Sequence, residues 1–357
     1  MTQHWLRNAW YVGMYSHDLP RGCVASRTVL GTPLALFREP SGAVVALEDQ
    51  CPHRAAPLSL GKLVDGGRLR CGYHGLEFDA SGRCVHNPHG KGIIPPGMAV
   101  RAFPTLERYG LVWIWTGEGA ADATLIPNYP VFESGAGFAI NHPDWLRMNV
   151  PYDLIIDNLL DLSHASYLHE GLLGNIHMIS GADIAVRREG DAVLVTREMS
   201  DKPPPEYFDL LYMADGKPAD VWNDARWQAP AHVLLDNGCT AHGTPRSAGG
   251  RIYVAHLITP ETDSTSLYHI VAARKLPEGG RSVDEAKVNA RLAELRRIAF
   301  SMQDEPMIQA QYRALQRSGG RFVGRLLPID GGATLWRRII DGLIKAEQTP
   351  SIPESSP

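Results

Sequence analysis

The sequence predicts an α+β protein in two parts, an all-β N-terminal part and a larger part that combines an antiparallel sheet with long helices. Residues 1–125 alternate short apolar runs with turn residues, a pattern typical of small β domains. The stretch 152–169 is mostly apolar and contains no Pro or Gly, which predicts a buried helix. Strand-like runs return between 183 and 272, and residues 284–316 have a helical composition.

The first domain, placed at 1–125, is expected to contain only short strands. Two loops rich in Cys and His, CPHR at 51–54 and CGYHG at 71–75, are expected to be hairpin tips within it. The apolar runs that predict its strands lie at 10–12, 29–30, 34–37, 44–47, 76–78 and 111–115.

The second domain, placed at 126–347, follows the helix at 152–169 with an antiparallel sheet and two further helices. Its strands are expected at 185–187, 192–198, 231–235, 251–258 and 266–273. In the helix at 284–316, a core-facing stripe is predicted from the spacing of Leu292, Leu295, Ile298 and Met302. Another helix is expected at 334–347, and the tail at 348–357 is expected to be disordered.

Composition excludes several classes of protein. The net charge of −4 gives no reason to expect nucleic acid or an anionic membrane as a partner. Five cysteines, an odd and sparse set, do not form a disulfide framework and suit a reducing compartment. The N-terminus has no signal-peptide pattern, and no run of 18 apolar residues is present. We therefore expect a cytoplasmic protein that does not cross a membrane.

Four residues form the first candidate metal site: Cys51 and His53, then Cys71 and His74. They are spaced C-x-H and C-x-x-H, with seventeen residues between the pairs. Two thiolates and two imidazoles suit a [2Fe–2S] cluster in which two His replace two Cys on one iron. A Cys2His2 zinc site is the alternative, although zinc fingers usually pair Cys with Cys and His with His. A Cys51–Cys71 disulfide would leave both histidines unexplained.

A second candidate site lies in the stretch 152–169. Asp161 and His164 share a helix face, whereas His164 and His169 lie about 140° apart on a regular helix. The two histidines reach one ion only if the helix is bent or broken. Two imidazoles and one carboxylate form the facial triad of non-haem Fe(II) oxygenases. Asp304 is the best candidate for the carboxylate, because a regular helix would turn it towards the core.

Simpler interpretations of these residues stay open at this point. Asp304 could be the N-cap of a helix that has Pro306 in its first turn. His164 and His169 could be core histidines with hydrogen-bonded partners.

The two motifs together resemble the oxygenase component of the Rieske non-haem iron oxygenases. CPHR and CGYHG are followed by DNLLDLSHASYLH, and the resemblance extends over essentially the whole chain. It implies an N-terminal Rieske domain and a C-terminal catalytic domain of the helix-grip type. The segments WYVG, APLSLG, ITPETD and LPIDGG…RRII resemble the branch of vanillate and dicamba O-demethylases.

The resemblance also implies a role for each motif residue. Cys51 and Cys71 would hold one cluster iron, and His53 and His74 the other. The ligands of the mononuclear Fe(II) would be His164, His169 and Asp304. Asp161 would connect the iron site to a cluster histidine, equivalent to His74, of a neighbouring subunit in a homotrimer. Asn158 matches an asparagine close to the iron.

The implied reaction uses O2 and electrons from NAD(P)H, delivered by a separate flavin- or ferredoxin-type reductase. The chain itself lacks the G-x-G-x-x-G and C-x4-C-x2-C patterns that such a reductase would need. The expected activity is O-demethylation of a methoxylated, vanillate-like aromatic acid with release of formaldehyde. Alternatives are hydroxylation of a benzylic methyl group or of a ring, a Rieske electron-transfer protein, and a zinc-stabilised binding protein.

The substrate is expected to lie between the sheet and the iron-binding helix. Since alternate residues of a strand face opposite ways, only one of Tyr268 and His269 should point inwards. His269, Tyr268 and His232 are the predicted substrate contacts. The wider set of candidate lining residues adds Leu159, Leu160, Leu234 and His256.

Overall fold

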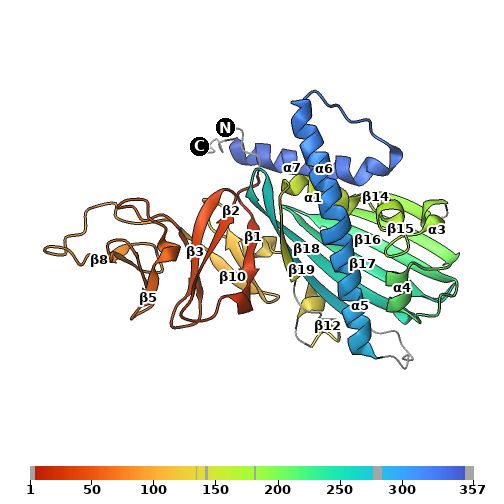
Figure 1. Cartoon of the computed structure of the whole chain (residues 1–357), viewed down its shortest axis with the longest axis horizontal. Coiled ribbons are helices and arrows are strands. Elements are labelled where there is room, and N and C mark those ends of the chain that lie inside the picture. The colour runs from red at the N-terminus through yellow and green to blue at the C-terminus, as the bar shows by residue number, and fades with distance from the viewer. Residues whose placement is uncertain (1–4, 134, 141–143, 181, 276–283, 350–357) are drawn as a thin grey trace, which may run out of the picture. The chain divides into compact units, whose positions relative to one another are not determined.

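The computed structural model describes residues 5–133, 135–140, 144–180, 182–275 and 284–349 (Figure 1). The chain forms two compact units. The first contains residues up to Ile126, the short segment Thr259–Asp263 and the chain from Ala346, and the second contains Pro127–Ile258 and Ser264–Lys345. Most of the predicted disordered tail at 348–357 lies outside the described residues. No helix among the described residues is long and apolar enough to cross a membrane.

The first unit is built from three small sheets, which confirms the all-β prediction. Their strand orders are β1-β11-β10, β2-β3-β4-β9 and β5-β6-β7-β8, and all their pairings are antiparallel. The strands are β1 (Trp10–Tyr15), β2 (Val24–Val29), β3 (Thr32–Arg38), β4 (Val44–Glu48), β5 (Lys62–Val64), β6 (Arg68–Arg70), β7 (Glu77–Phe78), β8 (Cys84–His86), β9 (Ala102–Phe103), β10 (Thr105–Arg108) and β11 (Leu111–Trp115).

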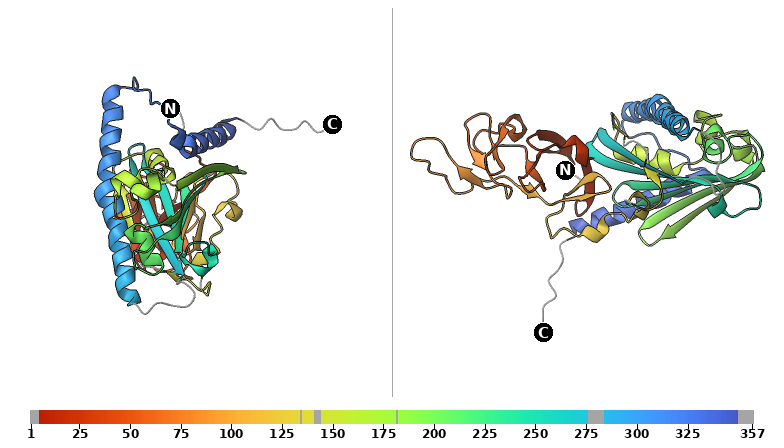
Figure 2. Two further views of the ribbon diagram at one scale, coloured as in Figure 1. Left: turned by 90° about the vertical axis from the view of Figure 1, so that its right-hand side faces the viewer. Right: turned by 90° about the horizontal axis from the view of Figure 1, so that it is seen from below.

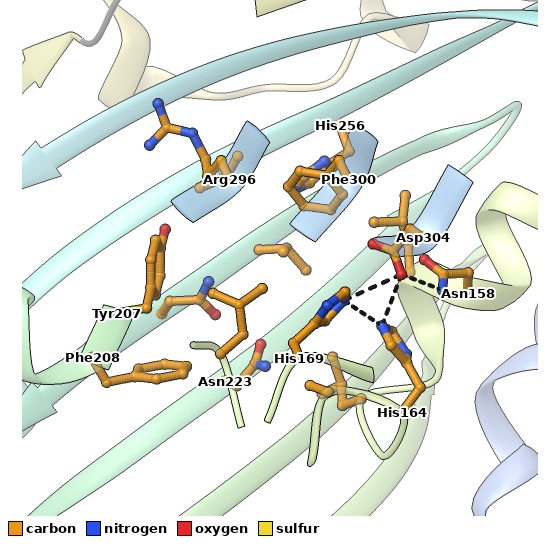
Figure 3. A pocket seen from close by; sticks show the side chains of 17 residues that line it. Asn158, His164, His169, Tyr207, Phe208, Asn223, His256, Arg296, Phe300 and Asp304 are labelled. Atoms are coloured by element: carbon orange, nitrogen blue, oxygen red, sulfur yellow. Dashed lines mark hydrogen bonds and ion pairs between the residues drawn. The ribbon is translucent and has the colours of Figure 1, made fainter. Parts of the chain in front are cut away.

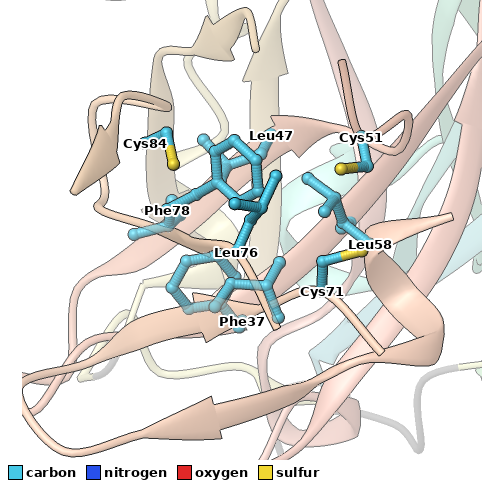
Figure 4. Packing of buried hydrophobic residues seen from close by; sticks show 11 residues of the cluster. Phe37, Leu47, Cys51, Leu58, Cys71, Leu76, Phe78 and Cys84 are labelled. Atoms are coloured by element: carbon cyan, nitrogen blue, oxygen red, sulfur yellow. The ribbon is translucent and has the colours of Figure 1, made fainter. Parts of the chain in front are cut away.

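A hydrophobic cluster forms the core between the second and third of these sheets (Figure 4). Phe37, Leu58 and Phe78 are completely buried in it. Cys51 and Cys71 belong to the same cluster and are only 2% exposed. The two loop cysteines are thus held on an apolar base.

The two Cys- and His-containing loops occupy different topological positions. The loop at 71–75 joins the paired strands β6 and β7, so it is the expected hairpin tip. The loop at 51–54 leaves β4, which pairs with β3 and β9, and leads to β5 in another sheet. The hairpin prediction is therefore wrong for this loop, because its flanking strands are not partners.

The two loops nevertheless have the same backbone conformation. The amide of Cys51 donates to the carbonyl five residues on, and the amide of Ala55 donates back to Cys51 at 2.8 Å. Cys71 and Gly75 repeat both bonds in the second loop. Ala55 (φ 54°) and Gly75 (φ 73°) are both left-handed, a conformation that costs a non-glycine residue about 1–2 kcal/mol. One turn geometry therefore presents a cysteine and a histidine twice.

The second unit contains one large sheet of order β12-β19-β18-β17-β16-β15-β14, with β13 also paired to β19. The antiparallel sheet is confirmed. Strand β16 was not predicted, because Asn and Asp interrupt its apolar pattern. The strands are β12 (Ala139–Ile140), β13 (Asp144–Met148), β14 (Ala182–Glu189), β15 (Ala192–Lys202), β16 (Ala219–Gln228), β17 (His232–Thr240), β18 (Gly250–Thr262) and β19 (Thr265–Lys275).

A long helix crosses one face of this sheet (Figures 1 and 2). It consists of α5 (Glu285–Arg297), the π-helix η6 (Ile298–Asp304) and α6 (Glu305–Ser318). Leu292 and Leu295 are buried as predicted, but Met302 is 57% exposed. A π turn holds more residues than an α turn, so a spacing of three and four no longer stays on one face. The remaining helices are α1 (Tyr152–Leu160), α2 (Ala165–Leu168), α3 (Ile176–Ser180), α4 (Glu206–Leu211) and α7 (Gly331–Gln348).

The single helix predicted at 152–169 is in fact two helices. Helix α1 ends at Leu160, and the backbone of Asp161 (φ −91°, ψ 86°) leaves the helical conformation. The one-turn helix α2 follows. Helix α1 is fixed by α7, because Trp336 Nε1 donates to Asp157 at 2.8 Å and Arg337 pairs with both Asp153 and Asp157.

Candidate metal centres

The two loops of the first unit bring their four predicted ligands together. The rings of His53 and His74 have their centroids 4.5 Å apart. Burial and the neighbouring Cys71 thiol raise the pKa of Cys51, and the backbone of His53 opposes this shift, so the two loops lie close enough for their side chains to interact. Both cysteines are free, which is inconsistent with the disulfide alternative.

The burial of these side chains is graded across the site. The two cysteines are buried, His74 is half-buried and His53 is exposed. Two inner thiols and two outer imidazoles fit a [2Fe–2S] cluster whose outer iron is held by His. Such a cluster would expose its histidine side to an electron donor.

Two buried carboxylates stabilise the loops. Asp49, just before the first loop, accepts hydrogen bonds from the amide and the hydroxyl of Ser59, at 2.6 and 2.5 Å. Glu77, just after the second loop, pairs with Arg68 at 3.0 Å and Arg70 at 2.8 Å. Because these carboxylates are buried and bonded, they fix the chain on either side of the candidate cluster site.

The second unit brings together the predicted triad (Figure 3). His169 Nε2 lies 3.2 Å from His164 Nε2 and 3.2 Å from Asp304 Oδ1. His164 Nε2 lies 3.5 Å from the same carboxylate oxygen. One ligand atom from each residue thus lies within 4.8 Å of the others.

The break in the predicted helix is what lets the two histidines converge. His164 is the residue before α2 and His169 the residue after it, so they stand at the two ends of a single turn. Arg197, which is only 2% exposed, donates from β15 to the carbonyls of Leu162 and Met178. These bonds hold the irregular backbone that carries the histidines.

Asp304 is buried and contributed by the end of the π-helix. Its Oδ1 accepts a hydrogen bond from Asn158 at 3.1 Å, and its Oδ2 has no partner in the described part of the chain. Asp304 does stand at the N-cap position of α6, with Pro306 in the first turn, but its side chain makes no capping hydrogen bond there. A buried carboxylate with an unpaired oxygen beside two imidazoles fits the donor set of a non-haem iron site.

The outer nitrogens of both histidines are hydrogen-bonded, which turns Nε2 of each ring towards the site. His169 Nδ1 donates to Gln303 Oε1 at 2.7 Å, and His164 Nδ1 donates to the backbone carbonyl of Asp161. Burial lowers the pKa of His169, but the hydrogen bond and charge of Asp304 outweigh it and raise the pKa overall. Sequence reasoning missed Gln303, whose only signal is its position next to Asp304.

The carboxylate of Asp161 bonds its own loop and not His164. Its carboxylate accepts from the amide and hydroxyl of Ser163, whereas His164 bonds the backbone carbonyl of Asp161. In this structure His164 is therefore bonded by the backbone oxygen of Asp161 and not by its carboxylate. The reason is the chain turn after α1, where the short Asp side chain bonds the amide two residues on.

A cavity adjoins the triad and lies between the sheet and the long helix (Figure 3). Its walls are mainly apolar with a few polar groups. The lining residues are Asn158, Leu159, Leu162, His164, Ala165, His169, Leu173, Tyr207, Phe208, Asn223, Leu235, Asn237, Val254, His256, Arg296, Phe300 and Asp304.

Leu159 and His256 line the cavity as expected, but the three predicted substrate contacts do not. His232 and His269 lie on strand positions that alternate with cavity-facing ones, and His269 stacks against Trp145 on β13. Tyr268 is on the correct face, but it lies behind His256 and its hydroxyl is 2.6 Å from His256 Nδ1. The prediction of His232, Tyr268 and His269 is therefore wrong for this cavity.

His256 is a neutral polar group in the cavity wall. Burial, aided by the charge of Arg296, lowers its pKa to about 3. Its Nε2 has no partner among the residues that the structure describes.

Comparison with known proteins gives the family. Residues 9–104 match the Rieske [2Fe-2S] domain, and residues 148–346 match the vanillate O-demethylase oxygenase C-terminal domain. The chain belongs to the Rieske non-haem iron oxygenases. The cofactors of the oxygenase are accordingly a Rieske [2Fe–2S] cluster and a mononuclear non-haem iron. The electron-carrier and zinc-protein alternatives are wrong.

Relatives of the oxygenase cover nearly all of it. The oxygenase component of chloroacetanilide N-alkylformylase from Rhizorhabdus wittichii is 34% identical, over 97% of this chain and 98% of that protein. The oxygenase component of dicamba O-demethylase from Stenotrophomonas maltophilia is 35% identical, over 85% and 87%. The crystal structure of dicamba monooxygenase bound to 3,6-dichlorosalicylic acid has a TM-score of 0.89 at 32% identity, covering 97% of this chain and 99% of that one.

Replacing Asp304 tests the carboxylate ligand. Asp304→Asn keeps the side-chain shape but removes the charge, so iron binding at the triad should weaken by at least about 100-fold. Metal analysis after gel filtration should show loss of the mononuclear iron with the visible absorption of the cluster intact. Glu305→Gln is the control, because Glu305 bonds Gln309 on α6 and should change nothing. Full iron content in Asp304→Asn would contradict the assignment.

Replacing Gln303 tests the orientation of His169. Gln303→Leu removes the acceptor for His169 Nδ1, so iron affinity should fall about 10- to 100-fold. Gln311→Leu makes the same exchange at an exposed position of α6 and should bind iron normally. Iron titration with a competing chelator measures both, and equal affinities would show that Gln303 does not position the ligand.

Proposed function

We propose that the oxygenase removes the methyl group of a methoxylated, vanillate-like aromatic acid and releases formaldehyde. The observation that carries the proposal is the largely apolar cavity that opens directly onto His164, His169 and Asp304. An aromatic ring suits such walls, and the few polar groups can orient its substituents. The relatedness to dicamba O-demethylase supports the same reaction class.

The overall reaction balances without a covalent step on the protein. The methoxy carbon, O2, two electrons and two protons give a hemiacetal and water, and the hemiacetal splits into a phenol and formaldehyde. When bound, the cluster delivers electrons and the iron activates O2 beside the substrate.

In this proposal the side chains of the chain hold the iron, orient its ligands and shield the reacting carbon from water. His164, His169 and Asp304 would hold the iron, and the amide of Asn158 fixes the carboxylate that it bonds. The apolar side chains of Leu159 and Phe300 keep water away from the reacting carbon. His256, neutral because of its burial, offers a hydrogen bond without placing a charge beside the ring.

The same proposal assigns the remaining predicted residues. Cys51 and Cys71 would hold one cluster iron, and His53 and His74 the other, within a domain at 1–125. The catalytic domain would be 126–347. A flavin- or ferredoxin-type reductase would supply electrons from NAD(P)H, and the active form would be a homotrimer. Asp161 would then connect the iron site to His74 of the next subunit.

The direct test is product analysis. The oxygenase, loaded with iron and supplied with electrons by a surrogate reductase, is incubated with a panel of methoxybenzoates. Formaldehyde, phenolic product and O2 consumed should appear in equal amounts for at least one member, and the corresponding hydroxybenzoates should release no formaldehyde. Hydroxylated products that keep the methoxy group would contradict the demethylase proposal and favour ring hydroxylation.

Asp161→Asn tests the electron path. The variant should keep the cluster and the mononuclear iron but turn over at least about tenfold more slowly, because the bridging carboxylate is lost. Reoxidation of the reduced cluster, followed by its visible absorption in a single turnover, isolates this step. Asp191→Asn removes an exposed carboxylate from the same unit and should behave as wild type. An unchanged reoxidation rate in Asp161→Asn would remove this residue from the path.

A further inference from the structure

Arg296 is a buried cation on the cavity wall. It lies at the end of α5, it is 8% exposed, and it lines the same cavity as the triad (Figure 3). It precedes Asp304 by eight residues, which separates the two by at most about 12 Å along the long helix, since the π-helical part rises less per residue. The cavity therefore has a cationic group well separated from the candidate iron ligands.

No carboxylate in the described residues pairs with Arg296, and its Nη1 atom has no hydrogen-bond partner among them. Leaving a buried guanidinium without an anion is costly. Asp304 is the carboxylate that lines the cavity, and its contacts are with His164 and His169.

Two other arginines of this unit have structural contacts. Arg197 donates to two backbone carbonyls and to Ser166, although its Nε has no partner among the described residues. Arg337 pairs with Asp153 and Asp157. Neither of them lines the cavity, whereas Arg296 does and has an unpartnered Nη1.

Tyr207 is a second polar residue in the wall of the same cavity. Burial raises the pKa of the Tyr207 hydroxyl overall, against the lowering effect of Arg296 and Asn237, and all three residues line the same cavity. A guanidinium nitrogen can only donate, and a tyrosine hydroxyl can donate its proton. Arg296 and Tyr207 therefore add two donors to a cavity wall that also contains apolar side chains such as Leu235 and Val254.

We infer that Arg296, assisted by the Tyr207 hydroxyl, binds the carboxylate of the aromatic substrate and so points the opposite side of the ring at His164, His169 and Asp304. This assignment rests on the proposed function, and it replaces His269 as the acid-recognising residue. A guanidinium and a carboxylate form two parallel charge-assisted hydrogen bonds, which fix direction as well as affinity.

The test compares benzoate with benzamide, which have the same shape and differ in charge. Calorimetric binding to the iron-loaded oxygenase should favour benzoate by about 10- to 100-fold, the range expected for charge-assisted hydrogen bonds. Arg296→Met should abolish this preference while benzamide binding changes by less than about threefold. Arg297→Met is the matched control, because Arg297 is the exposed neighbour and should leave the preference intact.

Two further variants separate recognition from folding. Arg296→Lys keeps the positive charge but loses the planar pair of donors, so it should retain part of the preference for benzoate over benzamide. Tyr207→Phe should reduce benzoate binding only, by about 3- to 10-fold. Equal affinities of the two probes in the wild type, or equal loss of both probes in Arg296→Met with normal iron content, would overturn the assignment. Because binding is measured without turnover, an oxygenase that prefers benzoate but forms no formaldehyde would contradict only the demethylase proposal.

Discussion

The second unit depends on one geometric constraint: the three side chains proposed to bind iron must meet in a site that regular helices could not form. His164 and His169 converge because α1 stops at Leu160 and one short turn separates them. Asp304 reaches them from a π-helix. Such departures from α-helical geometry have a cost, and here buried hydrogen bonds offset it, notably those from Arg197 to the irregular backbone. The irregular segments are therefore the ones that carry the candidate iron ligands.

In the first unit, a turn that occurs twice brings four candidate ligands together. Two loops with the same backbone hydrogen bonds each present a cysteine inwards and a histidine outwards. The apolar base buries the thiols, while Asp49 and Glu77 secure the chain beside each loop. Burial of one pair of ligands and exposure of the other makes the site directional, as electron entry from an outside donor requires.

The sequence predicted the family and the α+β class, and it named two sets of candidate ligands whose side chains lie together in the structure, because short motifs with distinctive spacing carry that information locally. It did not predict the break after Leu160 or the π-helix, since these depend on contacts made across the fold, such as Trp336 with Asp157. It also chose the wrong substrate contacts. A strand residue changes face when its register moves by one position, and neither His232 nor His269 carries a local signal of its face. Arg296 lacked a signal for the same reason, because it belongs to an ordinary helical pattern and is unusual only for being buried without a counter-charge.

The central claim is that one chain holds two distinct iron sites. The most direct test is to measure iron and acid-labile sulfide per chain in anaerobically purified wild-type protein, together with the electron paramagnetic resonance spectrum of its reduced state. The account predicts about three irons and about two sulfides per chain, with the spectrum of a His-ligated [2Fe–2S] cluster. About two irons and two sulfides, unchanged after addition of Fe(II), would contradict it, because the triad of His164, His169 and Asp304 would then bind no iron.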